Sequence, residues 1–210
     1  MEYNKWKYLF PPRPSHVITS DTLPMYEKRG WWAQYKKNGT CTTITLDPAG
    51  DLKFMTRHAE KHKAWQCPPW LGAFLLNIMP AKCWTMLVAE LLHSKTPTIK
   101  DTLFIHDVIV YKSTHLIDSS FAQRQIILDG ILPTAEATEH YSHWEIAAGV
   151  WRAKNLKSGF VEAFDNIKNP RIDEGLVVKD PAGKLKWCIK EDANKSWQAK
   201  ARYPTKNYQF

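Results

Sequence analysis

Two strand-forming runs in this chain end at the same four-residue turn, Asp-Pro-Ala-Gly, and this pattern limits the folds open to it. The first run, Thr40–Leu46, is followed by the turn at 47–50 and by the apolar segment Leu52–Met55. Proline presets the backbone of such a turn and glycine closes it without steric cost, so the segment predicts a β-hairpin. The second run, Glu174–Lys179, ends at the turn 180–183. A fold with many antiparallel strands is therefore expected.

The remaining patterns add further strands and a few helices. Strands are predicted at 31–35 and 103–111, helices at 119–132 and 155–166, a strand or a helix at 84–92, and one or two strands after Lys184. Runs of strands with only a few helices are typical of a mixed domain. The sequence thus predicts an α+β fold with mostly antiparallel sheets.

The organisation of the chain favours a single unit. A length of 210 residues allows one large domain or two small ones, and no long Gly/Ser linker or repeat divides it. Prolines at 11, 12, 14 and 24 predict an irregular arm over residues 1–25. We therefore expect one domain over 1–210, with this arm as its first 25 residues.

Composition and charge narrow the class of protein. The chain is 44% apolar with a formal charge of +8, which is ordinary for a globular protein and suits a polyanionic partner, although a merely soluble basic protein has the same balance. Its four cysteines show no CxxC spacing, which leaves zinc and thioredoxin-type redox sites without support. No apolar run approaches the ~20 residues of a membrane span, and the N-terminus is unlike a signal peptide. These features favour a cytoplasmic protein with no membrane partner.

A lysine beside a tight turn is the first candidate for chemistry. Residues 36–39 read Lys-Lys-Asn-Gly at the end of the strand predicted at 31–35. A lysine can attack phosphorus when burial or nearby cations lower its pKa, and Lys37 is one such cation. A solvated basic hairpin turn would have the same sequence.

Acids and cations in later strands are further candidates. Glu174 opens a strand and could hold a divalent metal, or could simply begin an edge strand. Lys200 and Arg202 point to the same face of a strand, as a triphosphate site needs and as an exposed charged face also shows. Asp107 lies inside a hydrophobic strand, where a charge needs a partner, either functional or in a structural ion pair.

In order and spacing, these segments resemble the covalent nucleotidyltransferase superfamily, which comprises ATP-dependent DNA ligases, RNA ligases and mRNA capping enzymes. The lysine signature K-x-(D/N/H)-G matches residues 36–39, and the motif E-G-(L/I/V)-(V/M)-(V/I)-K matches residues 174–179. The other elements of the family fall, in chain order, on Thr56–His58, Val88–Leu91, His106–Val108, Ser120–Leu128 and Lys200–Arg202. The resemblance spans residues 25–210. It implies mainly antiparallel sheets with flanking helices, in the ATP-grasp-like adenylyltransferase domain of polynucleotide ligases.

The resemblance assigns roles to the matched residues. Lys36 would be the nucleophile that takes AMP from ATP, and the other catalytic residues would be Glu174, Lys200 and Arg202. The ATP-binding residues would be Gln34, Arg57, Glu90, His106 and Lys179. Glu174 and Asp107 would bind Mg²⁺, with Mn²⁺ as the alternative, and Arg57 would also hold the 5′-phosphate of the nucleic acid.

Departures from the family pattern affect the substrate. Asn38 stands where DNA ligases usually have Asp, His106 replaces an aromatic that stacks on adenine, and Arg202 replaces a lysine. Because only eight residues follow Arg202, we expect no C-terminal OB domain of the kind common in the family.

The resemblance implies an ATP-dependent DNA ligase that seals 5′-phosphate/3′-hydroxyl breaks through a lysyl-AMP intermediate. An RNA ligase or a hybrid nick ligase of the same superfamily is the main alternative, followed by a capping enzyme and by an inactive nucleic-acid-binding module. The expected partner is nicked duplex DNA or an RNA-containing duplex, bound by a monomer. A compact ligase suggests a phage or viral source, and the location would then be the host cytoplasm.

Overall fold

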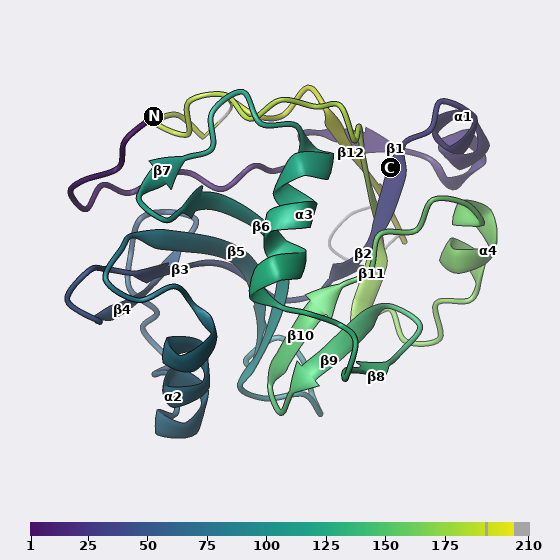
Figure 1. The fold of residues 1–210 in the computed structure, drawn as a ribbon. Coiled ribbons are helices and arrows are strands. Elements are labelled where there is room, and N and C mark those ends of the chain that lie inside the picture. The colour runs from purple at the N-terminus through teal and green to yellow at the C-terminus, as the bar shows by residue number, and fades with distance from the viewer. Residues whose placement is uncertain (192, 204–210) are drawn as a thin grey trace.

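The computed structural model describes residues 1–191 and 193–203, which form two β-sheets with four α-helices around them (Figure 1). No helix in this part of the chain is long and apolar enough to cross a membrane. The α+β class with mostly antiparallel sheets is confirmed.

The larger sheet has eight strands, which provide one wall of the site described below. Seven of them run in the order β4, β3, β5, β6, β10, β9 and β8, and β7 pairs with the end of β6. In that order, their bounds are Leu52–Thr56, Thr40–Leu46, Thr85–Leu92, Thr102–Tyr111, Val150–Ala153, His143–Ala147, Thr138–Glu139 and Thr114–His115. Neighbouring strands are antiparallel except β6 and β10, which are parallel.

The core of the larger sheet depends on two helices. α3 (Phe121–Ile131) packs against β6 and begins at a capping box, in which Ser120 and Gln123 bond each other's backbone N–H groups. α2 (Pro69–Ile78) buries Leu71 and Leu75 completely in the main hydrophobic cluster. Burying leucines of this kind contributes roughly 1.5–3 kcal/mol each.

The smaller sheet has four strands in the order β1, β12, β11 and β2. Their bounds are His16–Ile18, Gln198–Arg202, Asp173–Lys179 and Trp32–Lys37. β1 runs parallel to β12, and the other pairs are antiparallel.

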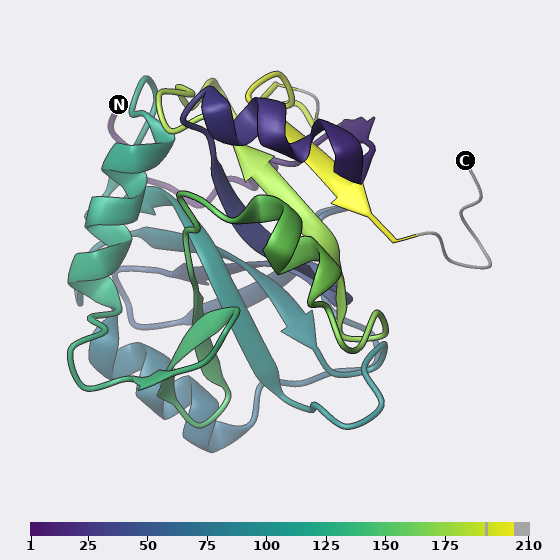
Figure 2. The ribbon, with the colours of Figure 1, turned by 90° about the vertical axis from the view of Figure 1, so that its right-hand side faces the viewer.

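The two faces of the smaller sheet differ in chemistry. One face packs beneath α1 (Leu23–Lys28) and α4 (Phe160–Asp165), which lie side by side over it (Figure 2). This apolar face consists of Ala33, Tyr35, Leu176, Val178, Ala199 and Ala201, packed with side chains such as Leu23, Phe160 and Phe164. Successive residues of a strand point to opposite faces, so Gln34, Val177 and Lys200, which lie between these, point to the other side.

Most of the predicted elements are confirmed. The run 40–46 pairs with 52–56 as a hairpin, and the backbone N–H of Gly50 bonds the carbonyl of Asp47 at 3.0 Å in its turn. The ambiguous run 84–92 forms strand β5. After Lys184 the described chain forms one strand, β12, and Lys184 itself makes only an isolated bridge.

The prediction of a helix over 155–166 is wrong in its first part. Leu156 pairs with Ala33 of β2 as an isolated bridge, and Gly159 has a φ of +73°, so α4 starts only at Phe160. The carboxylate of Glu27 accepts hydrogen bonds from the N–H groups of Gly159 and Phe160 and fixes this start.

The N-terminal segment is more ordered than the predicted irregular arm. Its residues 16–18 form β1, the residues Ser20–Thr22 form a 3₁₀ turn (η1), and α1 begins at Leu23. Before β1, the arm crosses the larger sheet without regular structure, with Tyr3 and Leu9 buried in the main core.

Candidate active site

A cleft of about 560 Å³ is lined by residues of both sheets. From β2, β11 and β12 it receives Gln34, Lys36, Glu174, Val177, Lys179, Gln198, Lys200 and Arg202. From the larger sheet it receives Thr40, Cys41, Thr56, Glu90, Phe104 and His106. The predicted site residues are therefore brought together, with the exception of Asp107.

Strand register aligns the nucleophile candidate with its partners. Gly175 in β11 lies opposite Lys36 of β2 on one side and opposite Arg202 of β12 on the other. Glu174 accepts hydrogen bonds at Oε2 from Lys36 Nζ, at 2.6 Å, and from the guanidinium of Arg202. Three charged groups from three strands thus meet at one carboxylate oxygen.

A β-bulge aims Glu174 at this point. The register between β11 and β2 shifts between Asp173 and Gly175, and Gly175 has a φ of +143°. A Cβ at this position would lie 2.0 Å from the carbonyl oxygen of Ala201, so only glycine fits. The glycine after Glu174 is therefore needed to seat the carboxylate.

The glycine of the lysine signature has a similar steric reason. A Cβ on Gly39 would lie 2.9 Å from the carbonyl oxygen of Leu91 and 3.0 Å from Oε2 of Glu90. Lys95 Nζ donates a hydrogen bond to the Gly39 carbonyl at 2.6 Å. This close approach brings the turn after Lys36 against the end of β5.

The carboxyl group of Glu90 has a raised pKa in this site. Burial raises the pKa of its carboxyl to about 7, with the Glu174 carboxylate adding to the rise and Lys36 and Lys95 opposing it. Glu90 therefore changes charge near neutral pH while lining the cleft beside the nucleophile candidate.

We expect the variant Glu90→Gln to gain stability relative to the wild type as pH rises. A folded-state pKa above the unfolded value means that the folded protein binds the proton more tightly, so ionisation at higher pH costs stability. The difference should be small below about pH 4.5, grow between there and about pH 7, and level off at no more than about 3 kcal/mol. Urea unfolding at about pH 5 and about pH 8 measures it, and an equal difference at both pH values would contradict the raised pKa.

Gln34, two residues before Lys36 on the same face of β2, is a second polar group in the cleft. Gln34 Oε1 accepts a hydrogen bond from Lys179 Nζ at 2.6 Å, and Gln34 Nε2 donates to Asn155 Oδ1 at 2.9 Å. Burial lowers the pKa of Lys179 to about 8, although the carboxylate of Asp107 opposes this shift. Both ends of the Gln34 amide are thus held in place.

His106 and Phe104 present two rings from the same face of β6. Burial and the charge of Lys179 lower the pKa of His106 to about 3, so its imidazole is neutral. Phe104 lines the cleft on the same strand. A neutral ring and a phenyl ring beside an ordered amide form a suitable slot for a flat heterocycle.

Asp107 does not line the cleft. Its carboxylate accepts two hydrogen bonds from Arg124 of α3, from Nε at 2.9 Å and from Nη2 at 3.0 Å. Both side chains are almost fully buried, at 1% and 0% exposure. The charge of Asp107, expected from the sequence to bind a metal, is thus paired with Arg124 in an ion pair that joins α3 to β6 outside the cleft.

Arg57 lies at the rim of the cleft. It follows the end of β4, is exposed, and bonds through Nε to His58 Nε2 at 3.0 Å. An exposed guanidinium at the mouth of a cationic cleft is well placed for a phosphate that enters from solvent.

Sequence reasoning missed a buried cluster behind the nucleophile candidate. Lys37 is expected from the sequence to act on Lys36, yet its Nζ lies 2.7 Å from Asp173 Oδ1 and donates to Ser142 Oγ at 2.9 Å. Its ammonium also lies 5.2 Å from the ring centroid of Phe104, and Tyr141 donates a hydrogen bond to Asp173. The alternation of β2 places Lys37 on the face away from Lys36, but the partner acid next to Glu174 has no distinguishing signal in the sequence.

The donor chemistry of the cleft fits a magnesium ion. The described residues contain no group of three metal-ligating side chains. Mg²⁺ at nucleotide sites, however, typically uses one or two carboxylates together with phosphate oxygens and water. Glu174 and Glu90 line the cleft and are close enough for the charge of one to raise the pKa of the other. These two carboxylates are the candidate ligands.

The chain was compared with known proteins. Its sequence matches no protein-family model and no curated protein. Among solved structures, a mycobacterial DNA ligase D complexed with ATP has a TM-score of 0.62 at 13% identity, over 94% of this chain and 62% of that one. The ATP-dependent DNA ligase from bacteriophage T7, also complexed with ATP, has a TM-score of 0.52 at 16% identity, over 91% and 68%. An archaeal ATP-dependent RNA ligase has a TM-score of 0.50 at 13% identity, over 91% and 48%.

These similarities cover nearly all of this chain but less than two thirds of the mycobacterial ligase. The similar structures include ligases of both DNA and RNA. The chain has the fold of the nucleotidyltransferase domain of ATP-dependent polynucleotide ligases.

Proposed function

We propose that this chain is an ATP-dependent polynucleotide ligase that joins a 5′-phosphate to a 3′-hydroxyl, with DNA as its substrate. The observation that carries the proposal is the meeting of Lys36, Glu174 and Arg202 in a cleft that also holds Lys200. The folds of two ATP-bound DNA ligases support it. The net charge of +8 suits a polyanionic substrate.

In the first step, Lys36 Nζ attacks the α-phosphorus of ATP. Lysine attacks only as the neutral amine, and Glu174 Oε2 at 2.6 Å is the acceptor placed to take its proton. A nitrogen–phosphorus bond forms as the bond from the α-phosphorus to the bridging oxygen breaks, and pyrophosphate leaves. Lys200 and Arg202 stabilise the charge on the phosphate oxygens.

The base of the nucleotide lies between His106 and Phe104. Gln34 faces it with an amide whose orientation is fixed by Lys179 and Asn155. Magnesium, held by Glu174 and Glu90, would neutralise phosphate charge.

In the second step, an oxygen of the 5′-phosphate attacks the phosphorus of the lysyl-AMP. The nitrogen–phosphorus bond breaks, Lys36 regains a proton, and Arg57 at the rim holds the incoming phosphate. In the third step, the 3′-hydroxyl attacks the 5′-phosphate, a phosphodiester bond forms and AMP leaves. The three steps use one ATP per break sealed.

A labelling experiment tests the proposal. The protein is incubated with Mg²⁺ and ATP labelled on the α-phosphate, and covalent label is measured after denaturation. We expect label from ATP and not from GTP, because GTP labelling would indicate capping chemistry. If no label appears, and the mass of the purified protein shows that Lys36 does not already carry AMP, a nucleic-acid-binding module becomes the better account.

The substrate is decided by a parallel sealing assay. Nicked duplexes with DNA, RNA or hybrid strands are compared at equal concentration, and salt is varied because phosphate contacts make binding salt-dependent. We expect the all-DNA nick to be sealed fastest. Faster sealing of an RNA-containing nick would favour the RNA ligase alternative. The similarity of this chain to the archaeal RNA ligase structure keeps that alternative open.

A further inference from the structure

The N-terminal arm brings an additional cation to the cleft. Arg13 lies between Pro12 and Pro14, and the segment from Phe10 to Pro14 lines the cleft although it precedes the signature lysine by more than twenty residues. The flanking prolines restrict the backbone at this point. No motif of the resemblance includes this arginine.

The arm is anchored on both sides of Arg13. Before it, the Leu9 side chain is 1% exposed in the core and the Phe10 N–H donates to the Cys188 carbonyl at 2.6 Å. After it, β1 pairs with β12, the strand that carries Lys200 and Arg202. The position of Arg13 is therefore set by the same strand that positions these cations.

Within the cleft, the charge of Arg13 acts on groups around Lys36, where the proposed function has the phosphates. Its charge acts on Lys200, whose pKa is lowered by burial first and then by the cations Arg202, Lys36 and Arg13. It also acts on Cys41, as do Arg57 and Lys36. The groups of the base slot, Gln34, His106 and Lys179, contact one another instead.

The guanidinium of Arg13 is held at the cleft by an exposed ion pair with Glu191. Arg13 Nη1 lies 2.9 Å from Glu191 Oε1, and the two side chains are 39% and 37% exposed. Exposed pairs of this kind are worth about 0–1 kcal/mol. A polyphosphate, which accepts two hydrogen bonds from one guanidinium, can replace Glu191 at little cost.

We propose that Arg13 binds the β- and γ-phosphates of ATP and stabilises the departing pyrophosphate, exchanging its ion pair with Glu191 for these phosphates. The inference rests on the proposed function. In-line attack by Lys36 puts the leaving group on the far side of the α-phosphorus, where a cation besides Lys200 and Arg202 is needed. Arg13 forms no covalent bond in this step.

Loss of Arg13 should slow the transfer of AMP to Lys36 and leave the final sealing step unchanged. In Arg13→Ala, the rate of covalent labelling by ATP should fall about 10–100-fold, as for loss of one charge-stabilising donor that is partly exposed. The reverse reaction, release of label from the lysyl-AMP protein by inorganic pyrophosphate, should fall by a similar factor. Sealing of a nick that already carries a 5′-adenylyl group involves no pyrophosphate and should stay within about twofold of wild type.

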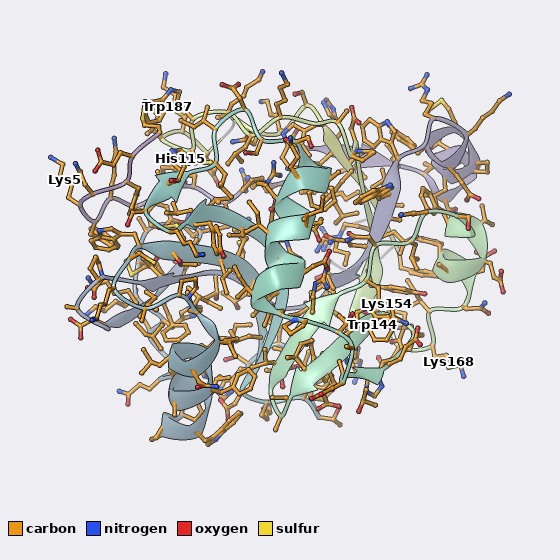
Figure 3. The ribbon with its side chains drawn as sticks, in the orientation of Figure 1. Lys5, His115, Trp144, Lys154, Lys168 and Trp187 are labelled. Atoms are coloured by element: carbon orange, nitrogen blue, oxygen red, sulfur yellow. The ribbon has the colours of Figure 1, made fainter. Side chains whose placement is uncertain are left out.

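Three further variants control the experiment. Arg13→Lys keeps the charge and should recover part of the labelling rate. Glu191→Gln removes the competing carboxylate and should label at least as fast as wild type. Lys5→Ala removes another cation of the arm, one that extends into solvent at the edge of the molecule (Figure 3), and should have no effect.

Equal labelling by wild type and Arg13→Ala would overturn this inference and leave the proposed ligase function intact. An equal loss in labelling and in sealing of the adenylylated nick would also overturn it, because Arg13 would then act on folding or on nucleic acid. Failure of the wild type to label, when its mass shows that Lys36 carries no AMP, would remove the proposed function itself, and this inference with it.

Discussion

Replacing Lys36 with alanine is expected to abolish covalent labelling by ATP and to lower ATP-dependent sealing by at least about 10⁴-fold. Lys36 Nζ donates a hydrogen bond to Glu174, which also binds Arg202. The neighbouring Lys37 is buried and paired with Asp173. No other amine is expected to take over the attack. The measurements are covalent label after denaturation and sealing of a nicked duplex.

The same variant offers an internal control. A nick that is adenylylated beforehand needs no lysine nucleophile, so Lys36→Ala should still seal it at a measurable rate. Lys36→Arg keeps the charge at this position but cannot act as a neutral nucleophile, and it should fail to label just as the alanine variant does. Persistent labelling of either variant would assign the nucleophile to a different residue.

Replacing Asp107 with asparagine is expected to lower the free energy of unfolding by about 3–5 kcal/mol. The change leaves the Arg124 guanidinium, at 0% exposure, without its counter-ion. For a domain of this size, such a loss lowers Tm by roughly 10 °C. Urea unfolding and thermal melting measure the effect.

The metal alternative for Asp107 predicts a different result. If its carboxylate held Mg²⁺, Asp107→Asn would keep its stability in metal-free buffer and would need more Mg²⁺ for labelling. In the ion-pair account, the folded fraction of the variant has the Mg²⁺ requirement of the wild type. Glu145→Gln is the matched control, because it breaks the exposed His140–Glu145 pair at 3.2 Å and should cost less than about 1 kcal/mol.

Local sequence patterns predict most of the strands of this fold. The hairpin at 40–56 and strands β6 and β11 can be predicted because turn residues and β-branched runs act over a few neighbours. The false start of the helix at 155 comes from the pairing of Leu156 with Ala33, which lies over a hundred residues away in the chain. Contacts of that kind are invisible to a local pattern.

The site is predicted through order and spacing more than through any one residue. Lys36, Glu174 and Arg202 are distant in sequence, and they meet because Gly175 pairs with both neighbouring strands. Asp107 shows what the sequence cannot predict. Its apolar strand indicates that the charge needs a partner, but whether that partner is a metal or Arg124 depends on how α3 packs on β6. Arg13 is missed because nothing in its short arm indicates that the arm reaches the cleft.

The cluster around Lys37 joins the two sheets at one end of the cleft. A side chain of β2 in the smaller sheet is held by Ser142, next to β9, and lies against the rings of Phe104 and Trp151 in the larger sheet. Because this attachment is buried beside the nucleophile, the two sheets are fixed together there. The arm and the Glu191 segment, which also line the cleft, are joined by an exposed ion pair instead. Hydrogen exchange should accordingly be slower in β2 and β11 than around the exposed Arg13 and Glu191.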